Sequence, residues 1–169
     1  MSMEMDALAD LQTPEDFEAL LAREEVRRGR TGELIAVGMV DLDGLRKINR
    51  ELGAGAGTDA LRLCAATLRS TLRAIDEVAR TGPDEFAVLM HATGARSASI
   101  WADRFEDELA AVSFEHGAGP LTCSIGIADT SEETLLQAAA KAHRRMEVIQ
   151  TVRKLRRARE GGAEPTGPA

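Results

Sequence analysis

Two clusters of acidic residues in this chain have the spacing to hold a divalent cation. Asp41 and Asp43 lie two residues apart at the end of an apolar run, and Asp84 and Glu85 lie at the tip of an expected hairpin. Alternate residues of a strand point to the same face, so Asp41 and Asp43 share a face if the strand continues that far. If the strand and the hairpin are neighbours in one sheet, the clusters meet, and such carboxylates bind Mg²⁺ together with substrate phosphates. The alternative is that these acids are solvated residues at a strand end and a turn.

The apolar pattern predicts the elements that position the first cluster. Pro14, preceded by a threonine, is typical of a helix start, and that helix is expected to run to about residue 28. Residues 34–40 are continuously apolar, which favours a strand covered on both faces. Three glycines in residues 53–57 indicate a flexible loop, and the apolar spacing that follows predicts a helix over residues 61–74.

The second cluster belongs to an expected hairpin, which is followed by a helix, a strand and a further helix. Glu77–Thr81 and Glu85–His91 predict two short strands joined by a Gly-Pro-Asp turn. Apolar residues at helical spacing predict a helix over residues 100–112, and the apolar run 121–128 predicts a strand. The segment Thr130–Glu133 resembles a capping box that opens a long last helix.

After the first helix the expected order of elements is β, α, β, β, α, β, α. This split pattern is that of ferredoxin-like folds and polymerase palm domains, and it predicts an α+β fold with helices packed on one antiparallel βαββαβ sheet. Residues 13–159 then form one domain, residues 1–12 an N-terminal segment before it, and residues 160–169 a disordered tail. Such folds carry many activities, so the fold alone does not give the function.

Charge and hydropathy exclude several classes of partner. The chain has 169 residues and a net charge of −7, opposite to the basic balance that nucleic-acid polymers and anionic membranes select. No apolar run approaches the roughly 20 residues of a membrane-spanning helix, and the acidic N-terminus does not resemble a signal peptide. We therefore expect a cytoplasmic protein. Cys64 and Cys123 are expected to be buried free thiols, and three scattered histidines predict neither a metal site nor a catalytic base.

Several motifs recur in the order and spacing of one known family. They are Asp41–Asn49 in the form Asp-Leu-Asp-Gly-Leu-Arg-Lys-Ile-Asn, the residues Gly53, Gly57 and Leu61, the signature Arg80–Phe86 in the form Arg-Thr-Gly-Pro-Asp-Glu-Phe, and Ser124–Ala128. Over residues 6 to 152 the chain resembles the GGDEF domain of diguanylate cyclases. The resemblance implies the nucleotidyl cyclase-like fold of that family. The Gly-Pro-Asp-Glu-Phe signature alone would be a weak indication, whereas several motifs in register are a specific one.

The resemblance also implies an activity and the residues that would perform it. The family joins two GTP molecules into cyclic di-GMP, and each domain of a dimer holds one GTP with Mg²⁺, which neutralises charge as a 3′-hydroxyl attacks an α-phosphate. Carried over by position, Asp41 and Asp84 would hold the metal, and Glu85 would be the catalytic companion acid near the reacting hydroxyl. Asn49 would contact guanine, and Arg46, another candidate for GTP binding, replaces the lysine of the first motif.

Four positions depart from the family pattern and predict weak GTP binding. Pro83 replaces the second glycine of the signature, which removes an N–H and adds a ring where the backbone approaches the substrate. Thr58 replaces an aspartate that would accept guanine N–H groups, so it is a weaker candidate for GTP binding. In the last helix the phosphate-binding lysine and arginine of the family fall on Glu147 and Thr151, and a carboxylate facing a triphosphate repels it.

A second site of the family is intact in this sequence. Arg73 and Asp76 form an RxxD motif at the spacing of the family's inhibitory site, and Arg104 matches an arginine that often completes it. The resemblance implies that this site binds cyclic di-GMP. Arginine forks grip phosphate and the guanine Hoogsteen edge, and an aspartate accepts from guanine N1 and N2. The alternative is that Arg73 and Asp76 form only a surface ion pair of little energetic value.

Three functions remain open. The sequence favours a degenerate GGDEF domain that makes little or no cyclic di-GMP and binds it as a receptor through Arg73, Asp76 and Arg104. The first alternative is an active diguanylate cyclase with product feedback inhibition. The second is a module that binds no nucleotide and contacts other proteins. The expected ligands are cyclic di-GMP and, less favoured, GTP with Mg²⁺, and the expected partners are a second copy in a homodimer or a separate protein.

Overall fold

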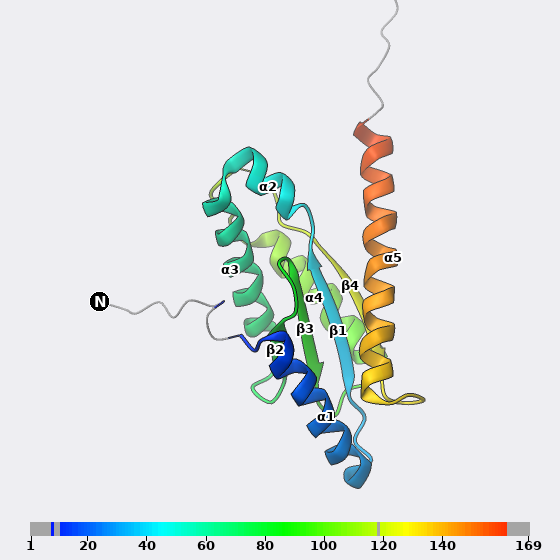
Figure 1. Cartoon of the computed structure of the whole chain (residues 1–169). Helices are drawn as coiled ribbons and strands as arrows, with labels where there is room; N and C mark the ends of the chain where they lie inside the picture. The colour runs from blue at the N-terminus through cyan, green and yellow to red at the C-terminus, as the bar shows by residue number, and fades with distance from the viewer. Residues whose placement is uncertain (1–7, 9–10, 118, 162–169) are drawn as a thin grey trace, which may run out of the picture.

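The computed structural model describes residue 8 and residues 11–117 and 119–161. Within these residues the chain forms five helices and four strands (Figure 1). In chain order they are α1 (Pro14–Thr31), β1 (Ala36–Leu42), α2 (Leu45–Leu52), α3 (Ala54–Thr71), β2 (Glu77–Arg80), β3 (Glu85–Met90), α4 (Ala95–Ala111), β4 (Cys123–Asp129) and α5 (Leu135–Gly161). The expected N-terminal segment 1–12 and tail 160–169 lie mostly outside the described residues.

The described strands form one antiparallel sheet in the order β2-β3-β1-β4. β1 lies between β3 and β4 and is antiparallel to both, and β2 pairs with the outer side of β3. The predicted α+β class and the split βαββαβ order are confirmed. This pairing sets which residues at the end of β1 face the start of β3.

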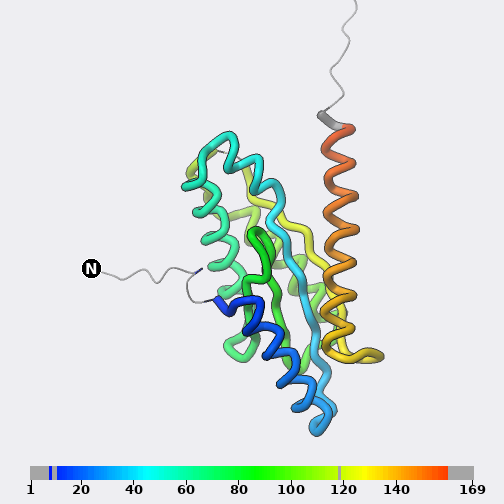
Figure 2. The backbone as a smooth tube through the Cα atoms, viewed as in Figure 1, coloured from blue at the N-terminus to red at the C-terminus, as the bar shows by residue number. Residues whose placement is uncertain are grey.

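Helices cover both faces of the sheet (Figures 1 and 2). α3 and α4 pack on one face, where their apolar residues share a core with Val40 and Leu42 of β1. α1 and α5 pack on the other face, against Val37 and Met39 of the same strand. β1 is therefore buried over its whole length, which explains why its sequence is apolar without alternation.

The glycine-rich segment differs from the expected flexible loop. α2 precedes it and α3 begins within it, so Gly55 and Gly57 are helical. Of the three glycines only Gly53, with a φ of 91°, adopts a conformation that favours glycine. Gly57 is needed for a different reason, because a Cβ there would lie 1.8 Å from Oδ1 of Asn49. Gly57 therefore serves the close packing of α2 on α3 rather than flexibility.

The start of the last helix also differs from the expectation. α5 begins after Thr134, four residues beyond the start of the predicted capping box Thr130–Glu133. Oγ1 of Thr130 instead accepts the N–H of Ile35 at 3.0 Å. The side chain of Gln137 accepts the N–H of Thr134 at 3.0 Å, and the hydroxyl of Thr134 accepts the N–H of Gln137 at 3.3 Å. Thr130–Glu133 and Thr134–Gln137 both have the residue spacing of a capping box. Because Thr130 bonds to Ile35, the segment Thr134–Gln137 caps α5.

Two further expectations concern the cysteines and the membrane. Cys64 and Cys123 are free and buried, and burial raises the pKa of the Cys64 thiol to about 12. None of the described helices is both long enough and apolar enough to cross a membrane.

α5 lies directly on β4 and continues past the ends of the strands (Figure 2). A Cβ at Gly126 would lie 2.0 Å from the carbonyl oxygen of Ala142 and 2.4 Å from the backbone nitrogen of Met146. Gly126 therefore lets the helix backbone approach the strand. That approach brings the later side chains of α5 over the end of β1.

We expect Gly126→Ala to lower the free energy of unfolding by about 2–3 kcal/mol, because the added methyl group meets backbone atoms rather than a side chain that can move. Gly29→Ala in α1 is the matched control, since nothing lies within 4 Å of a Cβ at that position. The control should raise the free energy of unfolding by about 0.5–1 kcal/mol. Chemical denaturation measures both variants. A Gly126→Ala protein as stable as the wild type would contradict the close packing of α5 on β4.

Candidate functional site

The two acidic clusters meet at one end of the sheet. Asp41 faces Glu85 across the pairing of β1 with β3. The N–H of Leu42 donates to the carbonyl oxygen of Asp84 at 2.8 Å. The predicted meeting of the two clusters is therefore confirmed.

The side chain of Asp41 is buried among other acids. Nε2 of Gln150, on α5, donates to Oδ1 of Asp41 at 2.6 Å. Burial, followed by the negative charges of Asp84, Asp43 and Glu85, raises the pKa of Asp41 to about 6, and the hydrogen bond from Gln150 opposes this shift. A cation between Asp41 and Asp84 would relieve the repulsion that raises this pKa.

The residues at this end of the sheet fit a magnesium ion that is shared with a nucleotide. Mg²⁺ keeps several waters and takes one or two carboxylates together with substrate phosphates. Asp41 and Asp84 offer the two carboxylates. The described part of the chain has no group of three or more His, Cys, Asp or Glu arranged to hold a metal alone. A metal here would therefore need ligands beyond the protein, such as phosphate oxygens.

Asp43 has different partners from Asp41. Its carboxylate accepts the hydroxyl of Thr122 at 3.0 Å and lies 3.4 Å from Arg153 and 3.2 Å from Arg157. β1 ends at Leu42, so Asp43 lies just beyond the strand, but Asp41 and Asp43 both contact side chains of α5. The basic end of α5 thus places two arginines, Arg153 and Arg157, beside Asp43.

The candidate catalytic acid Glu85 is held between two side chains. Oγ1 of Thr81 donates to its Oε1 at 2.8 Å, and Nε2 of His143, on α5, lies 3.2 Å from its Oε2. Nδ1 of the same imidazole lies 3.7 Å from Glu147, which stands where the resemblance expects a lysine. His143 is one of the three scattered histidines for which no site was expected. The available signal was its spacing of four residues from Glu147, which puts both on one helix face.

Pro83 is accommodated at the exposed tip of the β2–β3 hairpin. The N–H groups of Thr81 and Gly82 both donate to the carbonyl oxygen of Glu85, at 3.0 and 3.2 Å. Nη2 of Arg80 donates to the carbonyl oxygen of Pro83 at 2.7 Å. The turn therefore forms with proline in the signature, although the N–H that glycine would offer at this position is missing.

The candidate guanine contacts are divided between α2 and α3. Asn49 is exposed and lies against Gly57, near the start of α3. Oγ1 of Thr58 donates to the carbonyl oxygen of Ala54 at 3.0 Å, within its own helix. Arg46 is exposed on the same helix as Asn49. Because the hydroxyl hydrogen of Thr58 is donated to the backbone, only the oxygen of this hydroxyl is left to accept a hydrogen bond from a ligand.

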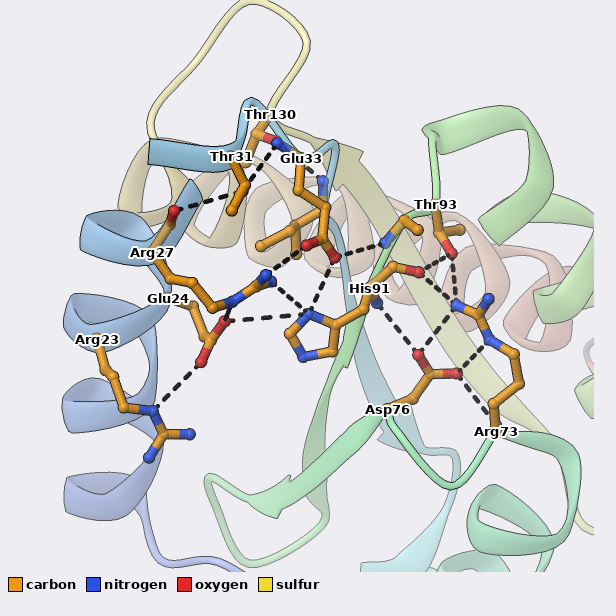
Figure 3. A network of polar contacts seen from close by, with 12 residues as sticks. Arg23, Glu24, Arg27, Thr31, Glu33, Arg73, Asp76, His91, Thr93 and Thr130 are labelled. Carbon is orange, nitrogen blue, oxygen red and sulfur yellow. Dashed lines mark hydrogen bonds and ion pairs between the residues drawn. The ribbon is translucent and has the colours of Figure 1, made fainter. Parts of the chain in front are cut away.

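The RxxD pair, Arg73 and Asp76, is closed on itself (Figure 3). Nε and Nη2 of Arg73 donate to the two carboxylate oxygens of Asp76, each at 3.1 Å. Asp76 also accepts the N–H of His91 at 3.1 Å, and Arg73 donates to Oγ1 of Thr93 at 2.9 Å. The Asp76 side chain is only 3% exposed, whereas that of Arg73 is 54% exposed. The expected ion pair is thus a partly buried fork anchored to the end of β3.

Arg104 lies at the same end of α3 as the RxxD pair. Its Nη2 donates to the carbonyl oxygen of Thr71 at 2.5 Å, two residues before Arg73. Its Nε lies 3.8 Å from Glu108, and its side chain is 58% exposed. The structure therefore brings Arg73 and Arg104, from separate elements, to one helix end, with both side chains more than half exposed.

A second polar network joins α1 to the loop that holds the RxxD pair (Figure 3). Arg27 pairs with both Glu24 and Glu33, and its Nη2 lies 3.0 Å from Nδ1 of His91. Glu33 accepts the N–H of Ala92, whose φ is 48°, at 3.0 Å. The hydrogen bond from Arg27 is the main cause that lowers the pKa of Glu33 to about 2. Sequence reasoning missed this network because Arg27 and His91 lie 64 residues apart with no recurring motif between them.

The sequence matches a family model described as diguanylate cyclase, GGDEF domain, over residues 3–154. The chain belongs to the GGDEF domain family. Among curated proteins, this GGDEF domain is 35% identical over 124 residues to diguanylate cyclase DgcP of Pseudomonas aeruginosa, an alignment that covers 72% of this chain and 18% of DgcP. The domain thus spans about a fifth of that relative.

Solved GGDEF structures share the fold. The GGDEF domain of TpbB from Pseudomonas aeruginosa is 30% identical, with a TM-score of 0.79 and coverage of 88% of this chain and 90% of that one. The GGDEF domain of DgcB from Caulobacter crescentus, solved in complex with c-di-GMP, also has a TM-score of 0.79, with coverage of 90% and 92%. It is 19% identical, so it supports the fold alone.

The Arg27 network predicts a pH dependence of stability. The pKa of Glu33 is lower in the folded protein than its usual value of about 4.3 in an unfolded chain. Its contribution is therefore complete above that value and is lost as the pH falls toward 2. At pH 7, Glu33→Gln should lower the free energy of unfolding by about 1–3 kcal/mol, because Arg27 loses a charged partner.

Urea denaturation of wild type and Glu33→Gln at several pH values measures this effect, and the gap between them should shrink below about pH 4. The matched control is Glu51→Gln, since Glu51 is half exposed and pairs with an exposed arginine. We expect little change in the control. A gap for Glu33→Gln that stays constant with pH would contradict the role of the Glu33 carboxylate.

Proposed function

We propose that this GGDEF domain binds cyclic di-GMP at the end of α3 and makes little or none of it from GTP. The observation that carries the proposal is the convergence of Arg73 and Arg104 at one helix end, with both side chains more than half exposed. Asp76 lies beside Arg73 as the acceptor. The match to a diguanylate cyclase family model supports the choice of ligand, because cyclic di-GMP is the product of that activity.

The ligand would exchange partners with the RxxD pair. The guanidinium of Arg73 would donate to a phosphate of cyclic di-GMP, and the carboxylate of Asp76 would accept from guanine N1–H and N2–H. Arg73 is more than half exposed, so its pairing with Asp76 is only partly protected from water and is of modest strength. Asp76 keeps the N–H of His91 throughout. Arg104 supplies the second guanidinium for phosphate or for the guanine Hoogsteen edge.

Weak turnover is supported by the groups around Asp41 and Glu85. Glu147 reaches this cluster through His143, and its carboxylate adds negative charge where a triphosphate must bind. Pro83 removes an N–H from the hairpin tip. If Mg²⁺ is bound, Asp41 and Asp84 would hold it, and the ion would polarise and neutralise the phosphate.

An active diguanylate cyclase is the second candidate function. It is favoured by the preserved meeting of Asp41 with Glu85 and by a hairpin turn that forms despite Pro83. DgcP, which is 35% identical, is named a diguanylate cyclase. In that case cyclic di-GMP at the RxxD pair would act as a feedback inhibitor, and two copies of the domain would have to meet as a homodimer.

Calorimetric titration of cyclic di-GMP into the purified protein tests the receptor function. We expect saturable micromolar binding, weakened by about tenfold to a hundredfold in Arg73→Ala and in Arg104→Ala through loss of charged hydrogen bonds. Arg50→Ala is the matched control, because Arg50 is an exposed arginine on α2. Arg104→Ala leaves the RxxD pair in place and so tests the site without disturbing that fork. No binding to the folded wild type would show that the RxxD pair is only structural.

Incubation with GTP and Mg²⁺ separates the receptor from the enzyme. We expect no steady formation of cyclic di-GMP by the wild type. Pro83→Gly combined with Glu147→Lys should raise GTP affinity by at least about tenfold, since it restores a backbone N–H and replaces a repelling charge. Steady synthesis by the wild type that Asp84→Ala abolishes would establish the cyclase instead. The third function, a module that binds no nucleotide, predicts that neither ligand raises the melting temperature.

A further inference from the structure

A groove of about 670 Å³ runs along the outer edge of β4, between α4 and α5. Its floor includes Ile125, Gly126 and Ile127. Val148 of α5 adds an apolar side chain that is 63% exposed. Within the described part of the chain, β4 is the last strand on this side of the sheet. The groove therefore follows a strand edge that is bordered by two helices.

Two arginines of α5 cover part of this edge. Nη1 of Arg145 donates to the carbonyl oxygen of Ile127, and Nη1 of Arg153 donates to the carbonyl oxygen of Cys123. Carbonyl groups two residues apart on a strand face the same edge, so the backbone of Ile125 also faces the groove. Two backbone carbonyl oxygens of this edge thus accept hydrogen bonds from arginine side chains instead of from a neighbouring strand. Charged side chains of this kind protect an exposed edge from unselective strand pairing.

The two walls of the groove differ in chemistry. Ser99 and Ala102 of α4 are small, whereas Lys141 and Arg144 of α5 are long and basic. Successive side chains of a strand point to opposite faces. A segment that extends the sheet here would therefore direct one set of alternate residues to the small wall and the other set to the basic wall.

The charge of the lining favours an acidic occupant. The groove has four basic side chains and two acidic ones, namely Lys141, Arg144, Arg145 and Arg153 against Asp103 and Glu106. Arg153 pairs with Glu106 at 2.7 Å, and Lys141 pairs with Glu133 at 2.5 Å. The excess of positive charge therefore lies at Arg144 and Arg145, in contrast to the net charge of −7 of the whole chain. Pairing of β4 with β4 of a second copy would bring two basic grooves together, and like charges across an interface are costly. An acidic partner segment meets no such repulsion.

We propose that the outer edge of β4 binds an acidic, extended segment of a partner protein as a fifth strand. Backbone hydrogen bonds to the edge supply affinity, and the alternation of small apolar and acidic side chains supplies specificity. Carboxylates of the segment pair with the exposed Arg144, and with Arg145 as it leaves the carbonyl oxygen of Ile127, while Arg153 keeps its ion pair with Glu106. This interaction does not depend on nucleotide binding, since the groove includes none of the residues assigned to cyclic di-GMP or GTP.

A synthetic peptide tests the proposal directly. The probe is a capped peptide of about seven residues, close to the usual strand length, that alternates valine with glutamate. The comparison probe alternates valine with lysine. Calorimetry measures affinity, and amide hydrogen exchange measures protection of the N–H groups of Ile125 and Ile127. We expect saturable binding of the glutamate peptide, at least about tenfold weaker binding of the lysine peptide, and slower exchange at both isoleucines.

Charge reversal within the groove supplies the matched variants. Arg144→Glu should weaken binding of the glutamate peptide by at least about tenfold, because it replaces attraction with repulsion at the basic wall. Arg50→Glu reverses the charge of an exposed arginine on α2 and should leave binding unchanged. A melting temperature close to that of the wild type shows that each variant is folded. Neither Arg144 nor Arg50 belongs to the proposed nucleotide sites.

Several results would overturn the proposal. These are no saturable binding of the glutamate peptide, equal binding of both peptides, or protection that appears away from Ile125 and Ile127. A dimer whose β4 amides are protected without peptide would assign the groove to a second copy. Faster exchange at these amides after removal of residues 162–169 would assign it to the chain's own tail.

Discussion

The antiparallel pairing of β1 with β3 is the constraint on which the rest of the site depends. Its register sets Asp41 against Glu85 and brings the backbone of Asp84 to Leu42. Helices cover both faces of β1, so the acids at its end are withdrawn from water and the pKa of Asp41 rises. Like charges gathered in a buried place are costly unless a cation or ligand offsets them. A cation bound at this end of the sheet would offset that repulsion.

α5 determines what this acidic end can bind. Gly126 lets its backbone lie directly on β4, and that contact sets the positions of all the side chains that follow. Gln150 then reaches Asp41, and His143 links Glu85 with Glu147. The same helix forms the basic wall of the groove along β4. One packing contact therefore influences both the nucleotide site and the free edge of the sheet.

The RxxD pair is tied to the rest of the fold through the end of β3. Asp76 accepts the backbone N–H of His91, and the side chain of His91 lies against Arg27 of α1. A ligand that drew Arg73 away from Asp76 would act on the same strand end that α1 holds. The fold thus contains a continuous polar connection from the proposed cyclic di-GMP site to the first helix (Figure 3), formed by contacts between elements that are distant in sequence.

The sequence by itself determined the order of the elements, the α+β class and the family, because apolar periodicity and motif spacing are local properties of the chain. It also predicted that the acids of β1 and of the hairpin would meet. It did not predict α2. Glycines occur both in flexible loops and where helices pack closely, and only the structure shows that Gly57 is of the second kind, because it lies against Asn49. Only the tertiary structure decided that Arg153 returns to Asp43, a contact across 110 residues, and that the N–H of His91 anchors Asp76. The physical reason is that such contacts depend on how α5 and the end of β3 pack, and no spacing along the chain records that packing.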